Sequence, residues 1–411
     1  MSKFWINEPV NKEEYSSFIN GKIMILKQDI LTHYLPNHLR WITLDITDDN
    51  TLNLVYQFLS ENYITDVNKM YRLDYSKEFI RWSWMSPGYN KELHLGLVCI
   101  NPIDNIPILV GVVIGTPTNM NINKINTTLI SINFLCIHEK LRNKQLAPLL
   151  IKEITRRSVL LNMDIALYTV AKKVTKPFSK CRFSNIYLNI KKLEDCVFLP
   201  KDYTGGKLQS DLALALTVYT TPYKVRPMTV NDIDALYELL PSFMSKYKVY
   251  QTFSKDEIKH YFLNNIVQTY IIEEIINYKI PTGIFDLCKI NIFRNDFTPK
   301  TIIGMFSIYG LPSKLLFKNK NSHINFAHLY YYFYDSQYIN MNDIIREACL
   351  YCKQCDYDII SLLNIMDYKH INSQKYIDND NEQDDDYDLY YYMYNYIIND
   401  ISNDELGVVL M

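Results

Sequence analysis

The segment of this chain best suited to chemistry spans residues 132–157 and reads INFLCIHEKLRNKQLAPLLIKEITRR. Its pattern predicts an apolar strand, a basic loop and a helix. Pro148 stands near the expected start of that helix, where its missing N–H is tolerated. Free N–H groups at a helix start, together with Arg142 and Lys144, form an electropositive concavity that suits a phosphate or pyrophosphate. The loop holds no glycine, so neither a dinucleotide fingerprint nor a P-loop fits it.

The strand before the loop supplies a second possible function. If its backbone leaves the sheet ladder after Phe134 and Leu135, unpaired N–H groups could point at a carbonyl oxygen. One fixed donor of this kind stabilises a developing oxyanion by about 3 kcal/mol in known cases. A buried strand followed by an ordinary basic loop remains the alternative on pattern alone.

Composition limits the classes of protein that need to be considered. The chain has 411 residues, 48% hydrophobic and 14% aromatic, which is enough for a large core and indicates two domains. A net charge of -2 provides no global basic field for binding nucleic acid. The eight cysteines lie mostly in apolar runs and the first residues lack a secretory signal, so we expect a reduced, cytoplasmic protein. No apolar stretch reaches the roughly 18 residues needed to span a membrane.

Strand-like and helix-like segments alternate along the chain and indicate an α+β (α/β layered) fold. Residues 41–63 resemble residues 225–247 in their entry, acidic first turn and apolar spacing, and GVVIGTPTN at 111–119 is echoed by GMFSIYGLPSK at 304–314. Chance similarity is possible for such short matches. If the repeat is real, the chain is two related halves, residues 1–205 and 206–411.

The segment 132–157 resembles the signature of the N-myristoyltransferases. The resemblance continues through KFWINEPV at 3–10, residues 61–88, residues 166–183, SIYGLPS at 307–313 and the final LGVVLM. It implies two tandem acetyltransferase-like (GNAT) halves related by pseudo-two-fold symmetry, the first holding myristoyl-CoA and the second much of an acceptor peptide. The implied enzyme transfers myristate to the N-terminal glycine of proteins, without a metal, and we expect it to be a monomer.

The resemblance assigns the acyl-CoA site residue by residue. The N-terminal residues Lys3, Phe4 and Trp5 would cover the acyl-CoA. On the strand, Phe134 and Leu135 would supply the oxyanion donors, and Cys136 and Ile137 would continue the acyl-CoA wall. The basic turn would cradle the phosphates with Arg142, Asn143, Lys144, Gln145, Leu146 and Ala147.

The resemblance also implies the chemistry of transfer. The family's general base is the C-terminal carboxylate, which falls on Met411, and Thr169 matches a residue near the attacking amine. An α-carboxyl in water has a pKa of about 3.5 and an α-ammonium about 8, so the proton transfer is unfavourable there. Burial in an apolar environment brings the two proton affinities together.

The acceptor side matches the family less completely. The matching positions are Ile64, Asp66, Tyr71, Leu73, Asn185, Ser307, Tyr331 and Asp386. The family's glycine-rich KFGxGDG loop is replaced by QDDDYDLYYY at 383–392, and Asn185 stands where the family has histidine. The family's acidic cluster near Asp66 has fewer acidic residues here, and Lys69 lies close to it. We therefore expect an altered or relaxed preference for basic residues downstream of the acceptor glycine.

Two other readings of the whole chain remain open. The first is a related N-acyltransferase with another acyl chain or acceptor, and the second is a non-catalytic acyl-CoA or lipopeptide binding protein. Cys349, Cys352 and Cys355 could suggest zinc, but their spacing by three residues follows one face of a helix and no fourth ligand lies nearby. We therefore expect a core helix there.

Overall fold

The computed structural model describes residues 2–12, 21–23, 35–66, 68–201, 203, 221–275, 301–317, 322–371 and 388–410. Up to residue 203 the elements are α1 (Ser2–Trp5), β1 (Gly21–Lys22), β2 (Leu39–Thr43), α2 (Asp49–Asn62), β3 (Tyr71–Leu73), α3 (Lys77–Trp84), η2 (Lys91–Leu93), β4 (His94–Ile100), β5 (Pro107–Ile122), β6 (Ile125–Ile137), η3 (Glu139–Leu141), α4 (Leu146–Leu160), β7 (Ala166–Val170), β8 (Ser179–Tyr187) and α5 (Ile190–Asp195).

From residue 221 onward the elements are β9 (Tyr223–Pro227), η4 (Val230–Asp232), α7 (Ile233–Met244), β10 (Val249–Gln251), α8 (Lys255–Phe262), β11 (Val267–Glu274), β12 (Ile302–Gly310), β13 (Ser313–Leu315), β14 (His323–Ile324), β15 (Phe326–Tyr334), α10 (Met341–Gln354), β16 (Ile359–Leu363), η5 (Met366–His370), β17 (Asp388–Tyr394), β18 (Tyr396–Ile397), η8 (Asn403–Glu405) and β19 (Leu406–Gly407).

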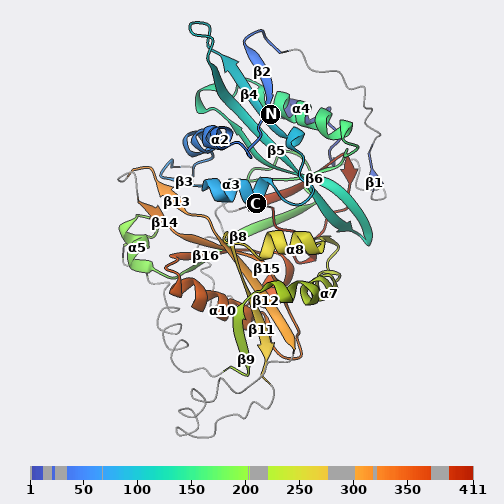
Figure 1. The fold of residues 1–411 in the computed structure, drawn as a ribbon, viewed down its shortest axis with the longest axis vertical. Coiled ribbons are helices and arrows are strands. Elements are labelled where there is room, and N and C mark those ends of the chain that lie inside the picture. Colours follow the sequence, from blue (N-terminus) through green and yellow to red (C-terminus); the bar gives the residue numbers. More distant parts are fainter. Residues whose placement is uncertain are drawn as a thin grey trace.

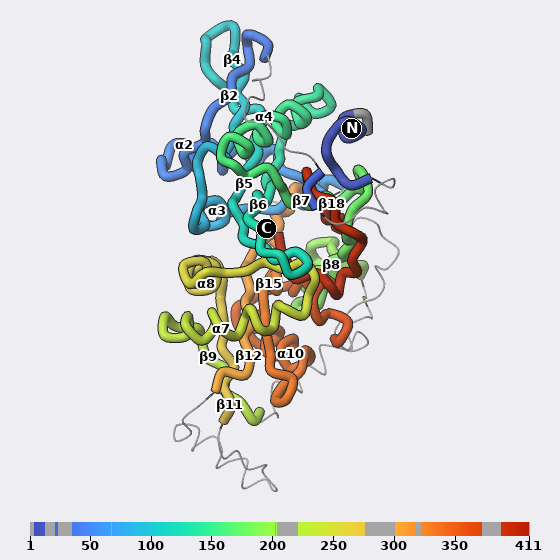
Figure 2. Tube along the Cα trace, turned by 90° about the vertical axis from the view of Figure 1, so that its right-hand side faces the viewer, coloured from blue at the N-terminus to red at the C-terminus, as the bar shows by residue number. Residues whose placement is uncertain are grey.

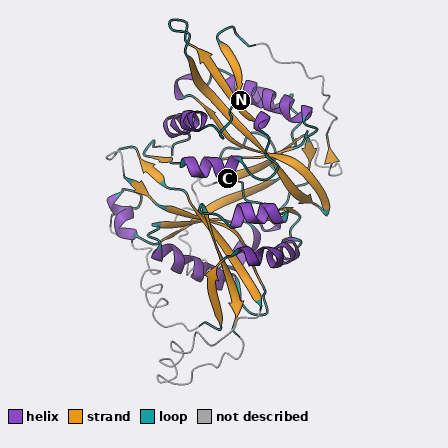
Figure 3. Ribbon diagram, viewed as in Figure 1, coloured by secondary structure: helices purple, strands orange, loops and turns teal. Residues whose placement is uncertain are grey.

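The described strands form a mixed 14-stranded sheet and two small sheets. Figures 1 and 3 show this sheet running through an elongated molecule with helices packed along it. The predicted α+β class is confirmed. Gly111 allows α4 to approach β5 closely, because a Cβ added there would lie 2.9 Å from Leu150 Cδ1.

The topology of the sheet repeats once along the chain. Antiparallel β2, β4, β5 and β6 are followed by α4 and by β7, which pairs parallel with β6. In the same way antiparallel β9, β11, β12 and β15 are followed by α10 and the parallel strand β16. The similar segments 41–63 and 225–247 correspond to β2 with α2 and to β9 with α7. The second pair of similar segments, beginning at 111 and 304, corresponds to β5 and β12.

The two repeats exchange their last strands. β8, which follows β7 in the chain, pairs with β16, whereas β17, which comes after β16, pairs with β7. β8 and β17 also pair with each other, so one sheet joins both repeats. The boundary between residues 205 and 206 stays a prediction, since residues 204–220 lie outside the described part of the chain.

Cys349 and Cys352 are buried on α10, as expected for a core helix, and Cys355 is exposed at its C-terminal end. Within the described ranges, no cluster of three His, Cys, Asp or Glu side chains is arranged to hold a metal ion. None of the described helices has the length and apolarity needed to cross a bilayer.

Candidate active site

A β-bulge interrupts the pairing of β5 with β6 at the strand predicted to carry the oxyanion donors. Val112 pairs with Cys136 and Ile114 with Asn133, so Phe134 and Leu135 together face Val113 alone. Phe134 has φ 54°, in the left-handed region. A non-glycine residue pays about 1–2 kcal/mol for this conformation. The ladder is therefore interrupted at Phe134 and Leu135 and resumes at Cys136, whereas the sequence predicted that the strand leaves the ladder after these two residues.

Burial of the Phe134 ring holds this unusual backbone in place. The ring is buried and packs with ring centroids 5.0 Å from Tyr75, 5.6 Å from Trp84 and 6.0 Å from Tyr63. Complete burial of a phenylalanine side chain contributes about 2–3 kcal/mol, which offsets the cost of the positive φ. The aromatic cluster thus fixes the direction of the peptide groups at the bulge.

β6 and β7 separate just beside the bulge. Their parallel pairing covers only residues 130–132 and 166–168, and β7 continues by pairing Thr169 with Tyr391 on β17. A cavity of about 460 Å³ opens here. Its lining is Trp5, Tyr63, Ile64, Ile130, Ile132, Asn133, Phe134, Leu135, Ile151, Ile154, Thr155, Ser158, Asp164, Ile165, Ala166, Tyr168, Thr169, Val170, Ala171, Val174, Phe183, Leu389, Tyr394 and Leu410.

The cavity brings together segments from both ends of the chain. Phe134, Leu135 and Thr169 line it together with Trp5 near the N-terminus and Leu410 near the C-terminus. In Figures 1 and 2 the C-terminal end lies in the middle of the molecule.

Two buried polar atoms in the cavity wall suit a polar ligand. The rings of Trp5 and Tyr168 stack with centroids 5.7 Å apart. Trp5 Nε1 and Tyr168 Oη are both buried, and neither has a hydrogen-bond partner in the described part of the chain. Burial raises the pKa of Tyr168 well above its ordinary value, so this hydroxyl can donate. Sequence reasoning missed Tyr168, whose position within a strand gives no sign of an unpaired hydroxyl.

The N-terminal segment is anchored beside the cavity by residues from the opposite end of the chain. Tyr394 Oη donates to Glu8 Oε2 at 2.6 Å, and Val10 forms a β-bridge with Tyr394. Phe4 packs with Trp5 and Val10 in a small apolar cluster without lining the cavity. The Lys3 side chain lies outside the described structure.

The turn between β6 and α4 adopts left-handed conformations without glycine. Asn143 and Gln145 both have φ 64°. Gln145 is the N-cap of α4 and makes no side-chain capping bond. The first N–H groups, those of Leu146 and Ala147, therefore have no cap from Gln145, and Pro148 at the third helical position has none to satisfy. This geometry suits an anion.

The two basic side chains of this turn have different surroundings. Lys144 is exposed. The Arg142 guanidinium instead donates to the carbonyl oxygens of Asn62, at the end of α2, and Ile137. Asn62 also accepts the Glu139 N–H at 3.0 Å through its side chain. The Arg142 side chain thus ties the loop to α2, and sequence reasoning missed the organising role of Asn62.

Cys136 and Ile137 lie behind the cavity wall rather than in it. Cys136 Sγ lies 3.3 Å from the carbonyl oxygen of Asn62. Burial raises the pKa of the Cys136 thiol to about 12, so it stays protonated and is a poor nucleophile.

The residues predicted for acceptor binding do not gather in one place. Ile64 lines the cavity and is 64% exposed. The Asp66 carboxylate accepts the N–H groups of Asn68, Met70 and Tyr71 and so holds its own turn. Leu73 on β3 pairs with Ser313.

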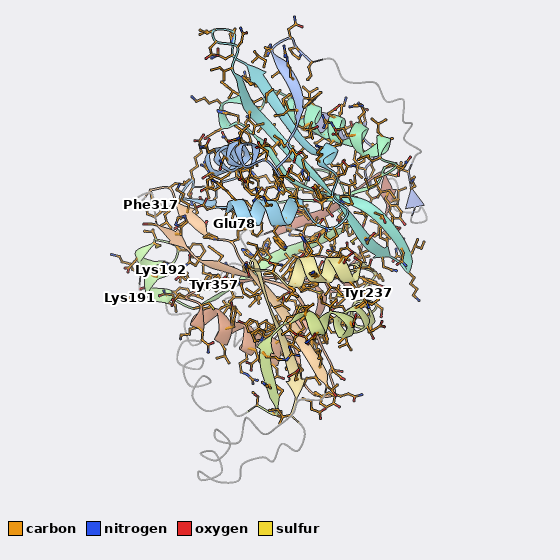
Figure 4. All side chains as sticks on the ribbon, viewed as in Figure 1. Glu78, Lys191, Lys192, Tyr237, Phe317 and Tyr357 are labelled. Carbon is orange, nitrogen blue, oxygen red and sulfur yellow. The ribbon has the colours of Figure 1, made fainter. Side chains whose placement is uncertain are left out.

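Two further acceptor candidates pack into strands away from the cavity. Tyr71 packs with Phe198 and Phe317 and donates to the carbonyl oxygen of Cys196. Figure 4 places Phe317 at the edge of the molecule. Asn185 is buried on β8, opposite Ser361.

Ser307 and Tyr331 bond to each other. Ser307 Oγ donates to the carbonyl oxygen of Tyr331 at 2.7 Å and accepts the Tyr331 N–H at 3.0 Å. Met411 and Asp386 lie outside the described residues.

Comparison with known proteins places the chain among acyltransferases. The model for the N-terminal domain of myristoyl-CoA:protein N-myristoyltransferase matches residues 24–181, and the model for its C-terminal domain matches residues 207–408. Glycylpeptide N-tetradecanoyltransferase of Candida albicans is 32% identical over 387 residues, covering 89% of this chain and 79% of its own. The enzyme of the same name from Plasmodium falciparum is 30% identical over 378 residues, covering 89% and 84%.

A crystal structure of Saccharomyces cerevisiae N-myristoyltransferase with bound myristoyl-CoA superposes with a TM-score of 0.83 at 27% identity, covering 100% of this chain and 94% of that one. Both the sequence and the fold therefore agree over nearly the whole chain. The chain belongs to the N-myristoyltransferase family, as its signature segments indicated, and is an acyltransferase.

Proposed function

We propose that this protein transfers myristate from myristoyl-CoA to the N-terminal glycine amine of acceptor proteins. The observation that carries the proposal is that the bulge of Phe134 and Leu135, Thr169 and Leu410 line one cavity. The names of the relatives and the myristoyl-CoA bound to the yeast enzyme support the choice of substrates.

The acyl donor would lie along the gap between β6 and β7. The uncapped start of α4 and Lys144 would hold its phosphates, and the apolar cavity wall would hold the acyl chain next to the thioester. Trp5 Nε1 and Tyr168 Oη offer donors to its amide oxygens, which supplies the partners that these buried atoms lack.

The chemistry would proceed by direct attack of an amine on the thioester carbonyl. The amides of Phe134 and Leu135 would stabilise the negative charge that develops on the carbonyl oxygen. The base would be the α-carboxylate of Met411, the residue after Leu410. It would take a proton from the glycine ammonium, and Thr169 would orient the amine. The C–N bond then forms, the C–S bond breaks, the second proton of the attacking nitrogen passes to the departing sulfur, and CoA leaves as its thiol.

Turnover with defined peptides tests the overall reaction. The protein is incubated with myristoyl-CoA or a shorter acyl-CoA and glycine-initiated peptides, alongside the same peptides beginning with alanine, and products are identified by mass spectrometry. We expect an amide-linked myristoyl group on glycine peptides alone. No acylated peptide, or a preference for shorter acyl-CoA, would contradict the proposal.

A single added residue tests the base. Appending alanine after Met411 displaces the terminal carboxylate by about 3.5 Å, and we expect it to abolish turnover while leaving acyl-CoA binding intact. The control is Met411→Leu, which changes the side chain but keeps the carboxylate in place. Full turnover in the extended protein would refute this base.

An altered acceptor preference is a narrower form of the same function. It is favoured by the Asp66 carboxylate, which is occupied by three backbone N–H groups, and by Lys69, which pairs with Glu139 at 3.6 Å. Comparing peptides that carry lysine, alanine or glutamate downstream of the glycine measures this preference. A strong preference for lysine would exclude the altered form.

A further inference from the structure

Two buried tyrosine hydroxyls hold the backbone of the C-terminal segment. Tyr391 Oη donates to the carbonyl oxygen of Val408 at 3.0 Å. The N–H of Val409 donates to Tyr331 Oη at 3.1 Å. Both tyrosines are fully buried. The next residue, Leu410, lines the cavity, so the two bonds act immediately before the chain enters the site.

The Tyr331 hydroxyl is oriented so that it can accept. Gln251 Oε1 lies 2.9 Å from Tyr331 Oη and can only accept a hydrogen bond, so the hydroxyl proton points to it. An oxygen lone pair is then left for the N–H of Val409. Phe253 and Phe262 pack edge-on against the Tyr331 ring, with centroids 5.1 and 6.0 Å away.

A β-bulge fixes the backbone that carries Tyr331. Between the pairs Phe306–Tyr332 and Ile308–Leu329, the strand β15 has one extra residue relative to β12. Ser307 Oγ bonds to both the N–H and the carbonyl oxygen of Tyr331 across this irregularity. Ser307 and Tyr331, expected from the sequence to contact the acceptor, therefore form part of the support for the C-terminal segment.

The sheet ladder alone does not hold this segment to its end. β19 pairs with β10 only through Leu406 and Gly407, and Val408 and Val409 follow it without a ladder. Both are buried, so loss of either tyrosine hydroxyl leaves a buried backbone group without its partner. The path of the chain beyond Gly407 thus depends on the two tyrosines.

We propose that Tyr391 and Tyr331, the latter oriented by Gln251, are positioning residues that aim the C-terminal segment, and with it the terminal carboxylate, at the bulge of Phe134 and Leu135. This role rests on the proposed function, because it places the base of that reaction. Neither Tyr391 nor Tyr331 lines the cavity, so both act through the backbone of Val408 and Val409.

Removal of single hydroxyls tests the proposal. In Tyr331→Phe and Tyr391→Phe we expect kcat to fall about tenfold and in the double variant about a hundredfold, because small displacements of a catalytic group are costly. The KM for acyl-CoA should stay unchanged. The matched control is Tyr332→Phe, which removes a buried hydroxyl that accepts the N–H of Asp367 at 3.1 Å; its kcat should stay within about twofold of the parent.

Digestion with carboxypeptidase gives a readout that does not depend on turnover. Release of Met411 and Leu410, followed by mass spectrometry, should be faster in the double variant than in Tyr332→Phe. Unchanged kcat in both tyrosine variants, with an active parent, overturns the positioning role and leaves the proposed function standing. If the unsubstituted protein has no transferase activity, the proposed function is wrong. If the double variant and Tyr332→Phe are also digested at equal rates, the two tyrosines do not anchor the C-terminal segment.

Discussion

At the scale of single residues, the site combines an unusual backbone with unreactive side chains. Phe134 contributes a peptide group held at positive φ by its buried ring, and its neighbour Cys136 is a protonated thiol behind the cavity wall. The unpartnered buried side-chain donors described in the cavity wall include the indole N–H of Trp5 and the hydroxyl of Tyr168. The Cys136 thiol is therefore poorly placed to act as a nucleophile toward a ligand in the cavity.

The reactivity of the cysteines tests the burial of Cys136. We expect iodoacetamide at about pH 8 to modify exposed Cys355 in the native protein and to leave Cys136 unmodified, because burial raises the pKa of Cys136 to about 12 and only the thiolate reacts. Peptide mass spectrometry after a timed reaction measures both. Modification of Cys136 as fast as that of Cys355 would contradict the buried position.

Buried histidines make stability depend on pH. Burial lowers the pKa of His94 from 6.5 to about 4, and His94 Nε2 lies 3.1 Å from the carbonyl oxygen of Trp84. Burial also lowers the pKa of His328 to about 4. Between about pH 4 and about pH 6.5, these histidines are protonated in the unfolded chain but neutral in the native protein. The free energy of unfolding should therefore fall as pH decreases, by up to about 1.4 kcal/mol per pH unit for each histidine.

Urea denaturation between about pH 7 and about pH 5 measures this dependence. His94→Gln removes one titrating group and should give a shallower decline than the parent protein. An identical decline in both would show that folding does not lower the pKa of His94.

At the scale of elements, the turn before α4 shows how left-handed backbone conformations can form without glycine. Gln145 occupies a left-handed conformation at the N-cap, and no side chain caps the helix at that position. Arg142 ties the preceding turn to the end of α2. These contacts supply the rigidity that holds non-glycine residues in a conformation they rarely adopt.

Substitution of Gln145 tests the importance of that conformation. Gln145→Gly removes a left-handed cost of about 1 kcal/mol, partly offset by greater freedom of the unfolded chain, so stability should change little. Gln145→Val should lower stability by about 1–2 kcal/mol, because a β-branched residue fits positive φ poorly. Thermal denaturation and calorimetric titration with CoA measure both variants. Equal affinity for CoA in Gly and Val variants would argue against a cradle at this turn.

At the scale of the whole molecule, the exchange of β8 and β17 joins the two repeats into one sheet. The cavity depends on this exchange, since Phe183 of β8 and Leu389 of β17 both line it. The N-terminal repeat needs β17 to pair with β7, and the C-terminal repeat needs β8 to pair with β16. The two repeats therefore have the same topology but fold together as one unit.

Expression of the halves tests this dependence. We expect residues 1–205 and residues 206–411 to be insoluble or unfolded when produced separately, because each lacks the strands that pair with its own, and to form a complex when co-expressed. Circular dichroism and size-exclusion chromatography measure the outcome, and the full chain should unfold in one transition. Cooperative unfolding of either half alone would contradict the prediction.

The sequence by itself determined the local features of this protein. The apolar strand, basic turn and helix of residues 132–157, the two copies of the β–α pattern and the helix carrying Cys349 and Cys352 follow from periodicity and turn chemistry, which act over a few residues. The family followed from motifs spread along the chain. All of these signals are carried by neighbours in sequence.

Only the tertiary structure decided which distant groups meet. Tyr331 and Ser307 hold the C-terminal segment, Arg142 bonds to Asn62, and Trp5 stacks on Tyr168. No sequence pattern specifies these contacts, because each joins segments from different parts of the chain through strand exchange and side-chain packing. Hydrogen-bond partners are set by the three-dimensional neighbours left after the core has formed.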